Sequence, residues 1–194
     1  MIINICMSIN FTANQVHQTT IPRKLSWRNY ADSAISIVEL DSKNDADIDA
    51  IIKTERNWTN NGGQYIHHFC RDFVENHRYV DIEKEHYYAL TTQNADFNKL
   101  NPKNILGVLM FSESKNFENE ITWLEVDPAT RKSAGRNREY KEVGKRLVEY
   151  ILNKYKEKDI FVQSAKDAIK FYKKLGAEQP YQRFPKKCQL YFRV

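Results

Sequence analysis

The chain has 194 residues, of which 41% are hydrophobic and 28% charged, with a net charge of +5 at pH 7. This composition is typical of a globular domain with a sizeable core, and it excludes a disordered chain. No run approaches the roughly 18 apolar residues of a membrane span. The first residues lack the basic flank and the long apolar run of a signal peptide. We therefore expect a cytoplasmic protein with no membrane segment. Its basic balance favours polyanionic ligands such as a nucleotide cofactor or nucleic acid.

The cysteine and histidine spacings argue against disulfides and metal ions. Cys6, Cys70 and Cys188 are far apart in the sequence and form no CxxC pair, so we expect neither a disulfide framework nor a zinc site. His67 and His68 lie close to Cys70, but their spacing is not a distinctive ligand pattern, and one polar helix face explains them. The sequence predicts no metal site.

The first half of the chain predicts an arm followed by two strands and two helices. Residues 1–30 show no clear period, and we expect them to form an extended N-terminal arm ahead of one domain over 31–194. Alternating apolar residues predict a strand, and isoleucines at helical spacing after acidic first-turn residues predict a helix. A glycine-rich break separates this helix from a second one. The expected elements are a strand at 35–40, helices at 45–58 and 64–80, and a strand at 86–92.

The second half predicts a mixed sheet. A nearly continuous apolar run at 105–111 is typical of a strand covered on both faces. The segment 120–163 reads strand, helix, strand, which favours a parallel pair with a right-handed crossover. This order of elements predicts the α/β class. The expected elements are strands at 105–111, 120–126, 159–163 and 189–194, and helices at 143–155 and 165–175.

One stretch has the arrangement that receives a diphosphate. A β-branched strand ends at Asp127-Pro128, a basic loop follows, and an amphipathic helix begins near Val143-Gly144. The first-turn amides of a helix have no partner within it, and the helix dipole favours an anion there. The stretch therefore predicts a phosphate-binding helix start.

The same stretch resembles the acetyl-CoA motif of the GNAT family of N-acetyltransferases, a strand ending in Val-x-Pro and then Arg/Gln-x-x-Gly-x-Gly/Ala before a helix. Val126-Asp127-Pro128 matches the strand end, and residues 139–144 fall on the diphosphate loop. Glu139 stands where arginine or glutamine is usual, and Glu142 stands where the first glycine is usual. Residues 135–143 also fit a subgroup pattern, Gly-x-Asn-Lys/Arg-x-Tyr-x-Gly-Val, apart from Glu142.

A second GNAT signature, Asn-x-x-Ala-x-x-Phe-Tyr-x-x-x-Gly-Phe, is similar to the segment AKDAIKFYKKLGA. Phe171-Tyr172 and Gly176 are retained, whereas Ala165 and Ala177 replace the terminal asparagine and phenylalanine. The resemblance covers residues 35–194 and is strongest over 105–176. It implies an α/β, GNAT-like fold with a mixed, mostly antiparallel central sheet flanked by helices.

The resemblance also implies an activity and a set of site residues. The activity is acetyl-CoA-dependent transfer of an acetyl group to a primary amine by direct attack. Tyr172 corresponds to the general acid for the departing thiolate, and Glu125 is the candidate base, acting through water. Amides at the end of the cofactor strand would hold the pantetheine arm, and amides of 140–145 would hold the diphosphate, with Arg136 as a further cation. The expected cofactor-binding residues are Leu124, Val126, Arg138, Tyr140, Lys141, Val143, Gly144 and Lys145.

Several alternatives remain open at this stage. The amine acceptor could be a small molecule, a protein, or an aminoacyl-tRNA, which the basic balance allows without favouring. A second reading is a non-catalytic binding module of the same fold, and a third is a nucleic-acid-binding protein that uses the basic cluster at 131–146. That cluster lacks the interleaved aromatic residues of a stacking surface. Tyr172 could instead be a core aromatic, the basic loop could be simply solvated, and a homodimer is left open.

Overall fold

The computed structural model describes residues 13–26, 29–63, 65–75, 82–114, 118–179 and 188–193. They form one sheet whose seven strands follow their order in the chain, from β1 at one edge to β7 at the other. The strands are β1 (Asn14–Lys24), β2 (Tyr30–Leu40), β3 (Ile82–Thr91), β4 (Ile105–Ser114), β5 (Asn119–Val126), β6 (Ile160–Gln163) and β7 (Gln189–Phe192). Neighbouring strands are antiparallel except β5 and β6, which are parallel as predicted.

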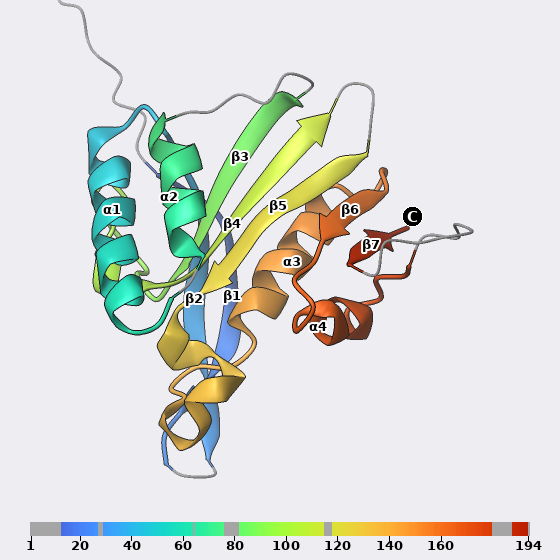
Figure 1. The fold of residues 1–194 in the computed structure, drawn as a ribbon. Helices are drawn as coiled ribbons and strands as arrows, with labels where there is room; N and C mark the ends of the chain where they lie inside the picture. Colours follow the sequence, from blue (N-terminus) through green and yellow to red (C-terminus); the bar gives the residue numbers. More distant parts are fainter. Residues whose placement is uncertain are drawn as a thin grey trace, which may run out of the picture.

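Four helices cover the sheet from both sides (Figure 1). They are α1 (Asp45–Asn60), α2 (Ile66–Glu75), α3 (Val143–Lys154) and α4 (Ile169–Lys174). Helices α1 and α2 pack against one face, and α3 packs against the other, so β4 is buried on both faces, as its apolar run predicted. The structure confirms the expected α/β class with a mixed, mostly antiparallel sheet flanked by helices.

Residues 14–24 correct one expectation. They were expected to belong to an extended arm, but they form β1, which pairs along its length with β2, from Asn14 opposite Glu39 to Lys24 opposite Tyr30. The strand is at the sheet edge and only Ile21 is fully buried, so its sequence carries almost no hydrophobic alternation. Residues 1–12 of the expected arm lie outside the described residues.

One predicted helix is longer than the observed one, and a second is described only in part. The helix expected at 165–175 is confined to the six residues of α4, after turns at 166–168. Helix α2 is described to Glu75, and the remainder of the expected span, 76–80, lies outside the described residues. Helix α1 begins as predicted, because Asn44 caps it by accepting hydrogen bonds from the amides of Ala46 and Asp47.

The first turn of α3 lies very close to β4 at Gly107. A Cβ atom at this position would lie 2.8 Å from Val143 Cγ1 and 3.0 Å from Leu147 Cδ1. The contact with Val143 is shorter than side chains tolerate and the contact with Leu147 is tight, so a glycine lets α3 approach β4 this closely without a shift of its first turn. Gly107 thereby helps to set the position of the helix start.

We expect Gly107→Ala to lower the free energy of unfolding by about 1–3 kcal/mol, because the added methyl overpacks a filled site. Denaturant unfolding at neutral pH measures this loss. Gly144→Ala is the matched control, since a Cβ there would make only ordinary contacts at 3.5 Å and beyond. Equal stability of Gly107→Ala and the unmodified chain would contradict the proposed close packing.

Candidate functional site

Strands β5 and β6 separate soon after they begin. They pair only at Asn119–Ile160, Glu120–Phe161 and Ile121–Val162. On its other side, β5 stays paired with β4 as far as Val126, opposite Gly107. Beyond Ile121, the β6-facing edge of β5 therefore has no strand partner within the described part of the chain. Backbone groups on that edge therefore need partners other than a strand, as the Val126 carbonyl has in Arg131 Nε at 3.2 Å.

The start of α3 lies over the end of β5. A Cβ on Gly144 would lie 3.5 Å from Val126 Cγ1, 3.7 Å from Leu124 Cδ2 and 3.5 Å from Phe171 Cζ. The structure thus brings together residues of both sequence motifs. The first α-helical hydrogen bond runs from the Arg146 amide to the Glu142 carbonyl at 3.0 Å. The amides of residues 143–145 consequently have no acceptor within the helix, which is the arrangement that binds anions.

Glu142 adopts the backbone conformation that favours glycine. It precedes α3 with φ 64° and ψ 13°, in the left-handed region. This explains why a glycine is usual at the corresponding place in the GNAT motif, and it means that the chain keeps the turn at some cost in strain. The Glu142 carboxylate lies 3.5 Å from Lys145 Nζ and 3.7 Å from Arg146 Nη2, so basic neighbours offset its charge.

The expected diphosphate donors are fewer than the sequence suggested. The Lys141 amide donates to the Pro22 carbonyl at 3.0 Å, and Tyr140 forms a bridge with Arg23 of β1. The Lys141 ammonium lies 3.4 Å from the centre of the Tyr30 ring. Backbone groups of the loop are therefore engaged by the edge strand, which leaves the amides of 143–145 as the donors best placed for a phosphate.

Arg138 supports the loop from within. Its Nε donates to the carbonyl oxygens of Thr130, at 2.6 Å, and Tyr140, at 3.0 Å. Burial lowers the pKa of the Arg138 guanidinium, with opposing contributions from Tyr30 and Glu142. The side chain expected to contact phosphate thus holds two segments of the loop together.

Glu125 lies on the sheet face covered by α1 and α2, because its cross-strand partner Val108 packs into that core. Its carboxylate forms an ion pair with Arg131, and only 11% of the side chain is exposed. Arg131 Nε also donates to the Val126 carbonyl at 3.2 Å. If the Glu125 carboxylate accepts a proton, it does so beside the positive charge of Arg131. The sequence did not reveal this partner.

Tyr172 is almost fully buried, in the core on the α3 side of the sheet. Its ring packs edge-on against Phe171, with centroids 4.9 Å apart, and Phe171 in turn lies beside Gly144. Burial raises the pKa of the Tyr172 phenol well above its ordinary value, so the hydroxyl stays protonated at neutral pH. The structure thus makes Tyr172 a core aromatic, and its role as a proton donor stays a prediction.

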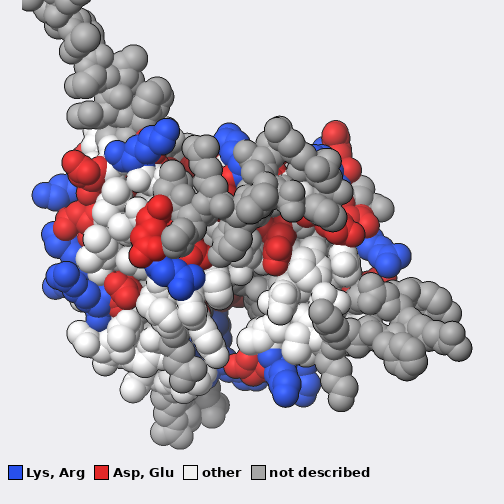
Figure 2. Space-filling view, turned by 45° about the horizontal axis from the view of Figure 1, so that its top comes forward, with Lys and Arg blue, Asp and Glu red and all other residues white. Residues whose placement is uncertain are grey.

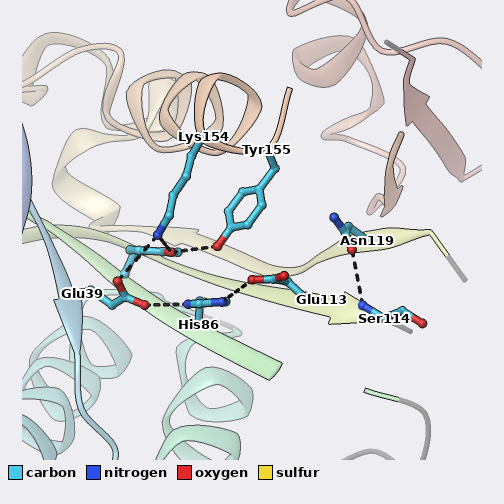
Figure 3. Close-up of polar contacts among 8 residues, drawn as sticks. Glu39, His86, Glu113, Ser114, Asn119, Lys154 and Tyr155 are labelled. Atoms are coloured by element: carbon cyan, nitrogen blue, oxygen red, sulfur yellow. Dashed lines mark hydrogen bonds and ion pairs between the residues drawn. The ribbon is translucent and has the colours of Figure 1, made fainter. Parts of the chain in front are cut away.

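A second polar cluster lies at the other end of α3 (Figure 3). His86 is buried between two carboxylates, with Nδ1 2.6 Å from Glu39 and Nε2 2.6 Å from Glu113. Each ring nitrogen thus lies at hydrogen-bond distance from a carboxylate oxygen, and the imidazole joins the two acidic side chains. Lys154 of α3 donates to the Tyr88 hydroxyl at 2.7 Å and lies 3.7 Å from Glu39. The cluster joins α3 to the strands β2, β3 and β4.

This cluster makes stability depend on pH. The hydrogen bond from His86 is the main cause that lowers the pKa of Glu39, and burial opposes it. The stabilisation is therefore present above the ordinary pKa of a glutamate and is lost as the pH falls through the lower, folded-state value.

We expect His86→Gln to lower the free energy of unfolding at pH 7 by about 2 kcal/mol, because two partly buried carboxylates lose their hydrogen bonds to the imidazole. The loss should shrink as the pH falls from 5 to 3, and denaturant unfolding over that range measures it. His17→Gln, on the exposed part of β1, is the control and should change little. A loss that is independent of pH would contradict this account.

Two absences apply to the described residues only. Within these ranges, no three His, Cys, Asp or Glu side chains gather as metal ligands. None of the helices described is long and apolar enough to cross a membrane.

Cys70 and Cys188 are free thiols. Burial, with a contribution from Glu55, raises the pKa of Cys70 to about 12.

The chain was compared with known families, proteins and structures. No protein-family model matches it, and no curated protein matches its sequence. Among solved structures, it is similar to that of "AtaT complexed with acetyl-methionyl-tRNAfMet", with a TM-score of 0.51 and 17% identity. The similarity covers 81% of this chain and 94% of that chain, and at this identity it establishes the fold alone. The chain therefore has a GNAT-like fold, the architecture that its sequence motifs implied.

Proposed function

We propose that this chain is an acetyl-CoA-dependent N-acetyltransferase that moves an acetyl group to a primary amine by direct attack. One observation carries the proposal. Three helix-start amides without intrahelical acceptors, those of Val143, Gly144 and Lys145, lie over the end of β5 where that strand has left β6. A diphosphate at these amides would place the attached chain along the open edge of β5.

The side chains near this edge suit the chemistry of acetyl transfer. The amine nitrogen bonds to the acetyl carbon, the carbon–sulfur bond breaks, and the proton lost by the amine passes to a base. Glu125 would accept that proton through water, with Arg131 stabilising the carboxylate. Tyr172, protonated at neutral pH, would supply a proton to the departing sulfur. An amide on the open edge of β5 would stabilise negative charge on the carbonyl oxygen.

The non-enzymatic nucleic-acid reading receives less support. Three arginines of the basic cluster have internal partners: Arg131 pairs with Glu125, Arg138 holds backbone carbonyls, and Arg146 bonds Glu149 at 3.0 Å. Figure 2 shows acidic and basic side chains interspersed over the visible face of the described residues. These arginines therefore stabilise the loop and α3 and do not form a broad polyanion-binding surface.

An aminoacyl-tRNA is the acceptor class with support from outside the chain. The similar solved structure is a complex with acetyl-methionyl-tRNAfMet, whose acetylated group is an aminoacyl amine. Figure 2 shows a hollow between the side that carries α1 and α2 and the side that carries α4, with charged residues at its margin. An acceptor amine could approach the end of β5 through this hollow.

We expect Glu142→Gly to bind acetyl-CoA several-fold more tightly and to be about 1 kcal/mol more stable, because glycine relieves the left-handed strain and removes a carboxylate beside the diphosphate. Calorimetric titration and denaturant unfolding measure the two effects. Glu142→Gln separates them, since it removes the charge and keeps the strain. If Glu142→Gly binds acetyl-CoA no more tightly than the unmodified chain, the assignment of this turn to the diphosphate is contradicted. If neither protein binds acetyl-CoA, the alternative of a non-catalytic binding module stands.

Tyr172→Phe should lower kcat roughly 100-fold, a magnitude typical of general acid catalysis, and leave acetyl-CoA affinity within about twofold. Release of free thiol from acetyl-CoA, measured with an aminoacyl-tRNA and with small amines, gives the rate. Phe171→Leu tests whether loss of aromatic packing alone explains the effect. Equal kinetics of Tyr172→Phe and the unmodified enzyme would remove Tyr172 from the mechanism.

A further inference from the structure

Three aromatic rings form a stacked shelf beside the end of β5, and a fourth ring lies tilted against it. Tyr65 directly precedes α2, His67 and His68 lie in its first turn, and Trp123 comes from β5. The His68 ring lies flat on Trp123, with centroids 5.0 Å apart and planes 5° apart. The Tyr65 ring continues the stack at 6.5 Å and 19° from His68, and His67 lies 3.8 Å from His68.

The inner end of this shelf is fixed. Trp123 Nε1 donates to Asp72 Oδ2 at 2.7 Å, and the Asp72 side chain is fully buried. A second Asp72 oxygen accepts from Arg71 Nη2 at 3.0 Å. Burial is the main cause that lowers the pKa of His68, so its ring is neutral at pH 7 and rests on the indole as an uncharged aromatic.

The outer end of the shelf is open to solvent. Half of the Tyr65 surface is exposed, and it is one of the few large apolar side chains so exposed among the described residues. His67 is also exposed. The Arg71 side chain, one helical turn from His67, is 48% exposed and lies beside the rings in an ion pair with the buried Asp72 carboxylate. Exposed rings next to a cation are the combination that binds single-stranded nucleic acid.

The shelf faces the reaction site proposed above. Trp123 and Glu125 are two residues apart on β5 and point to the same face of the sheet, roughly 7 Å from each other at the strand repeat. Both lie in the part of β5 that has left β6. The open end of the shelf, at Tyr65, lies two further ring spacings of 5.0 and 6.5 Å beyond Trp123, so a base stacked there would be a few nucleotides from an amine placed at the end of β5.

We propose that Tyr65, His67, His68 and Trp123 form a stacking subsite for the bases of a single-stranded RNA end that carries the acceptor amine. This inference rests on the proposed function and deepens it, since it names the part of the acceptor that this chain recognises. The subsite selects for unpaired bases and tolerates any base identity, because every base offers a planar face.

The test is binding of a short, end-labelled single-stranded oligoribonucleotide to the full chain, followed by fluorescence anisotropy at fixed salt. We expect Tyr65→Ala to weaken binding about tenfold and Tyr65→Phe, which keeps the ring, to stay within about twofold. His67→Ala should also weaken binding, and a duplex of the same sequence should bind less tightly. Equal binding by Tyr65→Ala and the unmodified chain, or no binding by the unmodified chain, would overturn the proposal.

Acetyl-CoA titration of the same preparations distinguishes a failure of the subsite from a failure of the enzyme assignment. The shelf lies on the α2 face and the diphosphate amides lie on the α3 face, so Tyr65→Ala should leave acetyl-CoA affinity unchanged. Unchanged cofactor binding with unchanged RNA binding would reject the shelf and retain the acetyltransferase.

Discussion

The early separation of β5 from β6 is the constraint on which the rest of the site depends. Only three residue pairs join the two strands, and beyond Ile121 the backbone edge of β5 has no strand partner in the described ranges. An unpaired edge inside a domain is costly unless something else satisfies it. Here the start of α3 lies over that edge, and the same geometry that leaves β5 open places unpaired helix amides beside it.

Contacts at both ends of α3 hold the helix in its place beside the unpaired edge of β5. Gly107 lets α3 approach β4, and the edge strand β1 holds the loop ahead of the helix. The Lys24 amide donates to the Glu139 carbonyl at 2.7 Å, and the Lys141 amide donates to Pro22. At the far end of α3, the cluster around His86 binds Lys154 and fixes the helix to the sheet. The helix is thus held at both ends, with its first-turn amides left for a ligand.

The sequence predicted those parts of the fold that carry a strong local period. The apolar run of β4, the stripe of α3 and the parallel β5–β6 pair follow from patterns within a few residues. Strand β1 did not follow, because an edge strand of mostly polar residues has no alternation to detect. Glu39 and His86 bond each other although they are 47 residues apart in the chain, and no local pattern encodes such a contact.

For the candidate site, the sequence located the helix start and both motifs but not their supports. It identified Glu142 as a departure from glycine, and the structure gives the physical reason, a left-handed residue at the turn. It expected Lys141 to donate to phosphate, whereas tertiary pairing with β1 uses that amide. It also treated His67 and His68 as one polar helix face, since their stacking on Trp123 depends on contact with a distant strand.

Hydrogen exchange at the start of α3 tests the central claim most directly. The account predicts that saturating coenzyme A slows exchange of the amides of Val143, Gly144 and Lys145, because the diphosphate becomes their acceptor, while amides of the shelf helix α2 change little. Binding of coenzyme A without added protection at residues 143–145, or no binding at all, would contradict the claim that this helix start receives the cofactor.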